Sequence, residues 1–251
     1  MSDLSPRREP ALNLPGVVVA LLAVMAAIHL VRTQLLTDAQ DLDLLARFAF
    51  VPGRYDGSAE AASLPGGALA GLWTPFTYAL LHGDWGHFLM NGIWLAAFGS
   101  ALARRFGAAR FLVFSALAAA AGAGVFYLAH PAAWVPVIGA SGAISGQMAA
   151  TARFVFQAGG PLAARRGDRR VFETPALPLG RLFADRQVVV FLVLWIASNL
   201  LFGLGVVTLA GEESPIAWEA HLGGFAFGLV AFSLFDPVRP PAAAVPAADR
   251  D

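Results

Sequence analysis

The segment Gly139-Ala140-Ser141-Gly142 places a serine between glycines at the start of an apolar stretch. A serine hydroxyl is a weak nucleophile until a neighbouring base takes its proton, so chemistry here would need a partner. Gly139 and Gly142 would let the backbone turn sharply and approach another group closely. The same glycines, together with Gly146, could instead serve only as small residues where two helices cross.

His221 is the candidate base. It stands at the start of another apolar stretch, one helical turn before Gly224, and Gly224 and Gly228 form a GxxxG pair that permits close helix contact. Such a contact could bring the imidazole within hydrogen-bond reach of Ser141, although a purely structural hydrogen bond between helices is the alternative. Glu219 lies on the wrong helix face to orient His221, so the sequence favours a Ser-His dyad over a triad with a carboxylate.

His87 and Asn91 are candidate hydrogen-bond donors. They are four residues apart, about 40° around an ideal helix, and therefore share one face. Donors held near a reacting carbonyl stabilise a tetrahedral oxyanion, and the backbone N–H of Ser141 could add another. His82 lies about 140° from His87 on an ideal helix. The glycines between these two histidines favour a loop, in which His82 would have a structural role.

The composition places these residues in a membrane. Of the 251 residues, 57% are hydrophobic and only 14% are charged, whereas a soluble domain carries about a quarter charged residues. The uncharged stretches 14–31, 111–129 and 188–210 are each long enough to cross a hydrocarbon core of about 30 Å. We predict an all-α polytopic membrane protein with six spans, at about 14–31, 87–103, 111–129, 138–156, 188–208 and 219–235.

The distribution of arginine predicts the orientation of these spans. Arginines precede the first span and cluster between the second and third and between the fourth and fifth, whereas 131–137 carries no charge. Both termini are therefore predicted to be cytoplasmic. The even-numbered spans then run from outside to inside, and Ser141, His221, His87 and Asn91 all lie within about 10 Å of the outer ends of their helices.

The order and spacing of these motifs resemble those of the rhomboid intramembrane serine proteases. The resemblance rests on Trp-Thr-Pro-Phe-Thr at 73–77, on His82, His87 and Asn91, on 139–142, and on 221–224 with Gly228, and it extends from about residue 11 to residue 236. It implies a six-helix bundle with a long, partly interfacial first outer loop at 32–72. It also implies Ser141 as nucleophile, His221 as general base, and His87, Asn91 and the Ser141 N–H as oxyanion donors.

Two positions depart from the family pattern. Some rhomboids carry a tyrosine four residues after the nucleophile, stacked on the catalytic histidine, where this chain has Ser145. The packing of His221 must therefore come from elsewhere. Thr74 stands where an arginine often follows the tryptophan of the first loop. Trp195 and Phe202 on the fifth span could form part of a gate for substrates.

The predicted organisation is a cytoplasmic segment at 1–13, a membrane-embedded protease domain at 14–236 and a disordered cytoplasmic tail at 237–251. The expected partners are single-span or polytopic membrane protein substrates and the lipid bilayer. We expect no cofactor, no metal and no nucleic acid. The net charge of zero gives no hint of nucleic-acid binding, and the lack of cysteine excludes cysteine metal sites. The expected location is a bacterial inner membrane, with the site opening to the periplasm.

Two other functions stay open. A catalytically inactive rhomboid-like protein could bind or chaperone membrane helices, although this chain retains both Ser141 and His221. A membrane metal hydrolase could instead use His82, His87 and His221 with Asp84 or Glu219. That alternative leaves Ser141 and Asn91 without a role.

Overall fold

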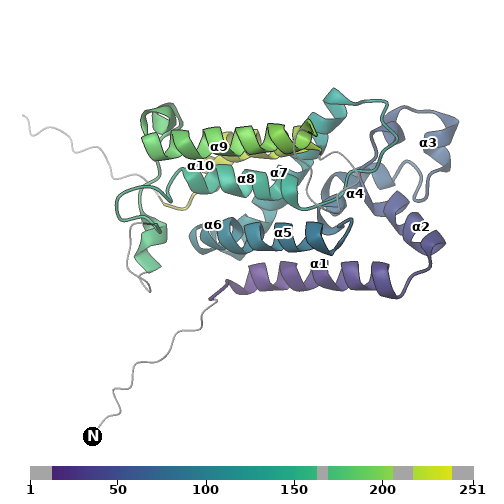
Figure 1. Cartoon of the computed structure of the whole chain (residues 1–251), viewed down its shortest axis with the longest axis horizontal. Helices are drawn as coiled ribbons and strands as arrows, with labels where there is room; N and C mark the ends of the chain where they lie inside the picture. The colour runs from purple at the N-terminus through teal and green to yellow at the C-terminus, as the bar shows by residue number, and fades with distance from the viewer. Residues whose placement is uncertain (1–12, 163–168, 206–216, 239–251) are drawn as a thin grey trace, which may run out of the picture.

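A computed structural model describes residues 13–162, 169–205 and 217–238, and 73% of these residues are helical. The one strand-like pairing among them is an isolated antiparallel bridge between Phe50 and Val137. The longer helices lie side by side, and the short helices α2 and α3 lie beyond one end of α1, with α4 nearer the long helices (Figure 1). The α-helices are α1 (Gly16–Gln34), α2 (Asp38–Phe48), α3 (Ala59–Ser63), α4 (Ala70–Thr77), α5 (Trp85–Trp94), α6 (Ser100–Phe106), α7 (Ala108–Ala129), α8 (Ser141–Ala152), α9 (Arg186–Gly203) and α10 (Trp218–Phe235).

Four helices in the described part of the chain, α1, α7, α9 and α10, are long and apolar enough to cross a membrane. They coincide with the predicted first, third, fifth and sixth spans. The predicted second span is a continuous helical stretch in which the π-helical segment Leu95–Gly99 joins α5 to α6. The predicted fourth span is shorter than expected, because only Ser141–Ala152 is α-helical. The all-helical membrane fold is thus confirmed.

The shortness of α8 follows from its place in the bundle. Eleven of its twelve residues are buried, so this helix is surrounded by protein along its whole length. A helix that does not face lipid need not match the thickness of the bilayer. Its far end is fixed by Arg153, whose guanidinium donates to the carbonyl of Leu177 and to Ser233 Oγ.

The contact between α8 and α10 is made from small residues. A Cβ at Gly224 would overlap the carbonyl oxygen of Gly142, and a Cβ at Gly228 would overlap that of Gly146. Each GxxxG pair therefore packs directly on the backbone of the other helix. The third helix of this group is α7, since a Cβ at Gly146 would stand 2.7 Å from Cβ of Ala118.

The long first loop folds against the bundle as short helices. A capping box between Thr37 and Gln40 starts α2. The indole of Trp73 in α4 donates to the carbonyl of Arg47 at 2.9 Å, and Thr77 Oγ1 donates to that of Phe48 at 2.7 Å. These bonds join α4 to the end of α2.

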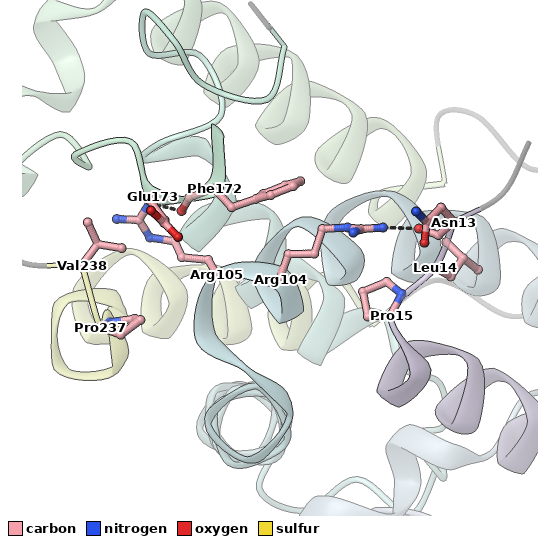
Figure 2. A pocket seen from close by; sticks show the side chains of 9 residues that line it. All are labelled: Asn13, Leu14, Pro15, Arg104, Arg105, Phe172, Glu173, Pro237 and Val238. Atoms are coloured by element: carbon pink, nitrogen blue, oxygen red, sulfur yellow. Dashed lines mark hydrogen bonds between the residues drawn. The ribbon is translucent and has the colours of Figure 1, made fainter. Parts of the chain in front are cut away.

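The opposite end of the bundle is closed by a buried ion pair. Arg105 in α6 binds both carboxylate oxygens of Asp236 at 2.8 Å and also donates to the carbonyls of Phe172 and Thr174. A cavity of about 700 Å³ lies beside this pair, and Arg104 bonds the carbonyl of Asn13 across it (Figure 2). The start of α1, the end of α6 and the end of α10 therefore meet here, as the predicted alternation of spans requires.

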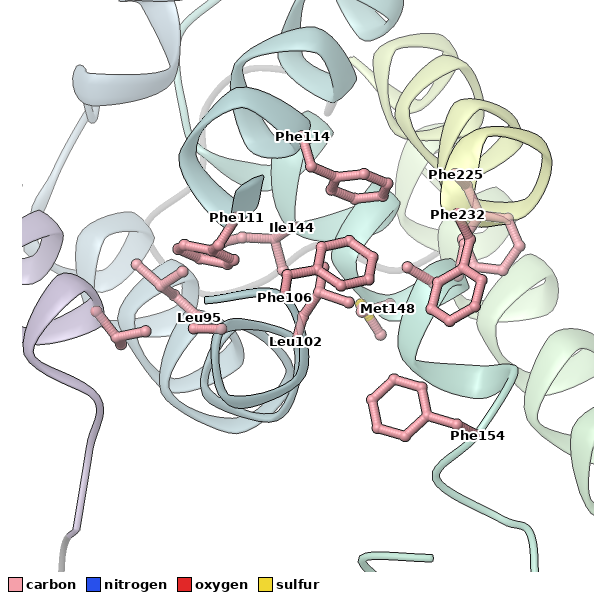
Figure 3. Close-up of a cluster of buried hydrophobic side chains, with 14 of the residues drawn as sticks. Leu95, Leu102, Phe106, Phe111, Phe114, Ile144, Met148, Phe154, Phe225 and Phe232 are labelled. Carbon is pink, nitrogen blue, oxygen red and sulfur yellow. The ribbon is translucent and has the colours of Figure 1, made fainter. Parts of the chain in front are cut away.

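Between the two ends lies an aromatic core. The rings of Phe106 and Phe232 stand 5.5 Å apart, and Phe106 packs edge-on against Phe114 (Figure 3). Leu102, Ile144 and other apolar side chains complete this cluster. This core joins α6, α7, α8 and α10 in the middle of the bundle, between the end that carries the Arg105–Asp236 pair and the end at which α8 and α10 begin.

Parts of the predicted organisation fall outside the described residues. These are residues 1–12 of the predicted N-terminal segment, 239–251 of the predicted tail, 206–208 at the end of the predicted fifth span, and the connections 163–168 and 209–216.

Candidate active site

Ser141 and His221 lie within hydrogen-bond distance. The Ser141 Oγ stands 2.7 Å from Nε2 of His221. Ser141 is the first residue of α8, and His221 lies in the first turn of α10. The crossing of α8 and α10 brings them together, because Gly142 follows the serine and its carbonyl contacts Gly224, one turn after the histidine. The sequence suggested either room for a reactive serine or a helix crossing as the reason for these glycines. The two are complementary, because the helix packing is what aligns Ser141 with His221.

A third residue, which the sequence did not suggest, completes this group. Nδ1 of His221 stands 2.6 Å from Oδ1 of Asn199 in α9. The Asn199 side chain also donates from Nδ2 to the carbonyl of Trp218 at 3.2 Å. Asn199 is 8% exposed. The available signal was a single amide within an uncharged span, where a polar side chain is costly unless it has a partner.

His87 lies beside the turn that precedes Ser141. The Asp84 side chain caps α5 by accepting the backbone N–H of His87 at 2.8 Å. The N–H of Gly83 points at Nδ1 of His87 at 3.5 Å, and this weak contact favours the tautomer in which Nε2 carries the proton. Gly139 has a φ of +120°, and a Cβ there would stand 2.6 Å from Nε2 of His87. Glycine is therefore required at position 139 by both conformation and space.

Asn91 is buried one turn further along α5. Its Nδ2 donates to the carbonyl of His87 at 2.9 Å. Within the described part of the chain, neither His87 nor Asn91 makes a hydrogen bond to Ser141. The first backbone N–H groups of α8 have no intrahelical acceptor, and no side chain caps this end of the helix.

His82 lies behind His87. It is fully buried, and its ring packs edge-on against those of His87 and Phe88 at centroid distances of 5.2 and 5.7 Å. Its ring nitrogens have no hydrogen-bond partner among the described residues, whereas its backbone carbonyl accepts from Arg32 at 2.7 Å. His82 thus contacts His87 through ring packing.

The carboxylates near this end of the bundle have other partners. Glu219 lies 2.8 Å from Nε2 of His130, and Asp84 caps α5. In residues 13–162, 169–205 and 217–238, no three histidine, aspartate or glutamate side chains gather as metal ligands would. The ligand set of the metal-hydrolase alternative is therefore dispersed.

The two predicted gate residues lie on α9. The indole of Trp195 stacks on Phe225 of α10, with ring centroids 3.9 Å apart and planes inclined by 22°. Phe202 is half-buried two turns later. Position 145 holds a buried serine, so no aromatic ring from this position covers His221. The imidazole is held instead by the Asn199 amide.

Comparison with known protein families gives one match. The model of the Rhomboid domain matches residues 69–236, which is 168 of the 251 residues. A comparison with curated protein sequences found no match. The matched region begins just before α4 and ends at the residue that pairs with Arg105, so it contains every helix that contributes to the site. The chain is therefore an integral membrane protein that belongs to the rhomboid family.

Proposed function

We propose that this protein is an intramembrane serine endopeptidase in which Ser141 and His221 form the catalytic dyad. Rhomboid proteins are generally serine intramembrane proteases. The observation that carries the proposal is the 2.7 Å distance between Ser141 Oγ and His221 Nε2, which joins a nucleophile to a base across two helices. Its substrates are single-span or polytopic membrane proteins, cleaved in or near a transmembrane helix.

The reaction proceeds through an acyl-enzyme. Ser141 Oγ attacks the carbonyl carbon as its proton passes to Nε2 of His221, which forms a tetrahedral oxyanion. Collapse of this intermediate breaks the C–N bond, and the same proton passes from His221 to the leaving amine. Water then attacks the ester with His221 as base, which releases the acid and restores the Ser141 hydroxyl.

The oxyanion is held by three donors. The backbone N–H of Ser141 has no intrahelical acceptor, and Nε2 of His87 lies beside Gly139. The second N–H of the Asn91 amide is the third donor, since the first is bonded to the carbonyl of His87. Donors fixed before substrate arrives stabilise developing charge without the cost of reorganisation.

We place the site on the periplasmic side of a bacterial inner membrane, with both termini cytoplasmic. The support is the positive-inside distribution of arginine. Arg104 and Arg105 lie at the end of the bundle opposite to Ser141. Substrates enter beside α9, where Trp195 and Phe202 form part of the gate.

The first experiment compares wild type with Ser141→Ala in liposomes, using a panel of single-span substrates and a fluorophosphonate probe. Ser145→Ala is the matched control, because it removes the hydroxyl of a buried serine in the same helix. Wild type and the control should cleave substrate and bind the probe, and Ser141→Ala should do neither. Equal cleavage by wild type and Ser141→Ala would refute the dyad.

The alternative of an inactive helix-binding protein makes a different prediction. It expects neither cleavage nor labelling in wild type, with substrate binding unchanged by Ser141→Ala. A reporter substrate cleaved by another rhomboid protease in the same liposomes excludes an unsuitable panel as the cause.

A further inference from the structure

We propose that Asn199 is a positioning residue that fixes the orientation and the tautomer of His221, so that the site is a relay of Ser141, His221 and Asn199 drawn from three helices. This inference rests on the proposed function. The relay differs from a Ser-His-Asp triad because its third member is a neutral amide on another helix.

The orientation of the Asn199 amide is determined by Trp218. The backbone carbonyl of Trp218 can only accept a hydrogen bond, and it lies 3.2 Å from Nδ2 of Asn199. The nitrogen of the amide must therefore face Trp218. The oxygen then faces Nδ1 of His221, 2.6 Å away, since the reverse orientation would set two oxygens against each other.

The orientation of the amide determines the tautomer of the imidazole. An amide oxygen is only an acceptor, so Nδ1 of His221 carries the proton. In a neutral imidazole, Nε2 is then unprotonated, and its lone pair faces Oγ of Ser141 at 2.7 Å. This is the tautomer that can take the serine proton. The other tautomer would place a lone pair against Asn199 and an N–H against the serine.

A neutral acceptor fits this position because the nearby carboxylates are engaged elsewhere. Glu219 pairs with His130, and Asp84 caps α5. A buried carboxylate would carry a large desolvation penalty, which an amide avoids. The Asn199 oxygen still carries partial negative charge, so it stabilises the imidazolium that forms when His221 takes the proton.

The relay also couples the dyad to the position of α9. Asn199 is buried in a helix whose neighbouring Leu194 and Leu201 are 64% and 45% exposed. The contacts that hold this part of α9 against α10 are the stack of Trp195 on Phe225 and the approach of Gly203 to Trp218. Movement of α9 away from α10 would therefore remove the acceptor from His221.

The test measures kcat and KM in liposomes for Asn199→Leu and for the control Ser198→Ala. Leucine keeps the volume of asparagine but cannot accept a hydrogen bond, whereas Ser198 bonds only the carbonyl of Trp195 in its own helix. We expect kcat of Asn199→Leu to fall roughly 10- to 100-fold, by analogy with the loss found when a hydrogen-bond partner that orients a metal-binding histidine is removed. KM should change less than about twofold, and Ser198→Ala should resemble wild type.

Two further readouts separate positioning from a structural role. In ¹⁵N spectra of histidine-labelled protein, the signals lost in His221→Gln belong to His221, and they should report the Nδ1–H tautomer in wild type and a mixture in Asn199→Leu. Asn199→Asp should regain part of kcat, because one carboxylate oxygen can accept the proton of Nδ1. The recovery should be incomplete, because the other oxygen meets the Trp218 carbonyl. The added charge should move the acid limb of the pH–rate profile to higher pH, since a carboxylate favours imidazolium.

The other titratable groups that face this end of α10 are His87 from α5, and Glu219 and His130, which pair with each other. None of them is changed in these variants. Full kcat in Asn199→Leu, or the same tautomer in it and in wild type, would refute the role of Asn199 while leaving the dyad intact. Failure of the proposed function would be seen in a different experiment, since it would appear as cleavage that persists in Ser141→Ala.

Discussion

Two contacts meet at His221, and they are built in opposite ways. On one side, α10 packs against α8 through glycines, so that each helix touches the backbone of the other at Gly142 and Gly224. On the other side, α10 meets α9 through an aromatic stack and the Asn199 amide. A smaller share of α9 than of α10 is buried. The first contact aligns Ser141 with His221, and the second orients the His221 imidazole.

The difference shows how rigidity is distributed in the site. Backbone contact between helices leaves no side chain that could change rotamer, so the separation of the α8 and α10 backbones at Ser141 and His221 is fixed by the fold. The α9 contact depends on side chains that can separate without disrupting α8 or α10. The proposed gate beside α9 requires this helix to move, and contacts between side chains allow that movement more easily than backbone contact does.

The largest effect is expected at the glycine contact. Gly224→Ala should lower the free energy of unfolding by about 1–3 kcal/mol, because the added methyl meets backbone that cannot move aside. Cleavage should fall by about 100-fold, the cost of misplacing reacting groups by about 1 Å. Unfolding in detergent and cleavage in liposomes measure the two effects.

Gly124→Ala is the matched control for that substitution. Gly124 also lies in a membrane helix, α7, but it is exposed and a Cβ there would meet nothing within 4 Å. This variant should cleave normally and be slightly more stable, since alanine favours helix over glycine by roughly 0.5–1 kcal/mol. Equal loss in both variants would show that the α8–α10 contact is not the cause.

A smaller effect is expected at the aromatic contact. Trp195→Ala removes the stack on Phe225 and should lower the free energy of unfolding by about 1 kcal/mol, the value of such a pair. Cleavage should change less than about tenfold, because the approach of Gly203 to Trp218 still holds α9 beside α10 and keeps Asn199 near His221. If it fell as far as in Gly224→Ala, the two contacts would not differ as proposed.

Leu194→Ala is the control on the same helix. Leu194 is 64% exposed and does not take part in the stack of Trp195 on Phe225, so its truncation should leave cleavage unchanged. A double-mutant cycle of Trp195→Ala with Phe225→Leu isolates the stack itself.

The same contrast explains what the sequence revealed. The family, the helical fold and the residues near the start of α8 and α10 could be predicted because each leaves a local pattern: uncharged length, glycines at a spacing of four, and a histidine one turn before them. The roles of Ser141, His221, His87 and Asn91 stay predictions until activity is measured.

Asn199 could not be predicted in this way, because its partner lies 22 residues away on another helix and no spacing rule relates them. The length of α8 could not be predicted from the hydropathy pattern either. Hydropathy predicts helices that face lipid, whereas α8 is enclosed by protein and ends where Arg153 turns to Leu177 and Ser233. Contacts between distant segments, and burial by protein instead of lipid, are the two features that local patterns omit.

The smallest effect is expected at a polar pair that belongs to neither contact. Asp43 and Arg47 form an exposed i,i+4 pair on α2, and the hydrogen bond from Arg47 holds the pKa of Asp43 below its usual value. Asp43→Asn should leave cleavage and the unfolding midpoint unchanged at neutral pH within error, because exposed pairs contribute little.

Any contribution of this pair has a defined pH dependence. Since the folded-state pKa of Asp43 is lowered, the contribution is present above the unfolded-state pKa and is lost as the pH falls through the folded-state value. Wild type and Asp43→Asn should therefore converge in acid. Loss of cleavage in Asp43→Asn at neutral pH, comparable to that of Trp195→Ala, would show that α2 acts on the site and that the comparison between the α8 and α9 contacts omits a third region.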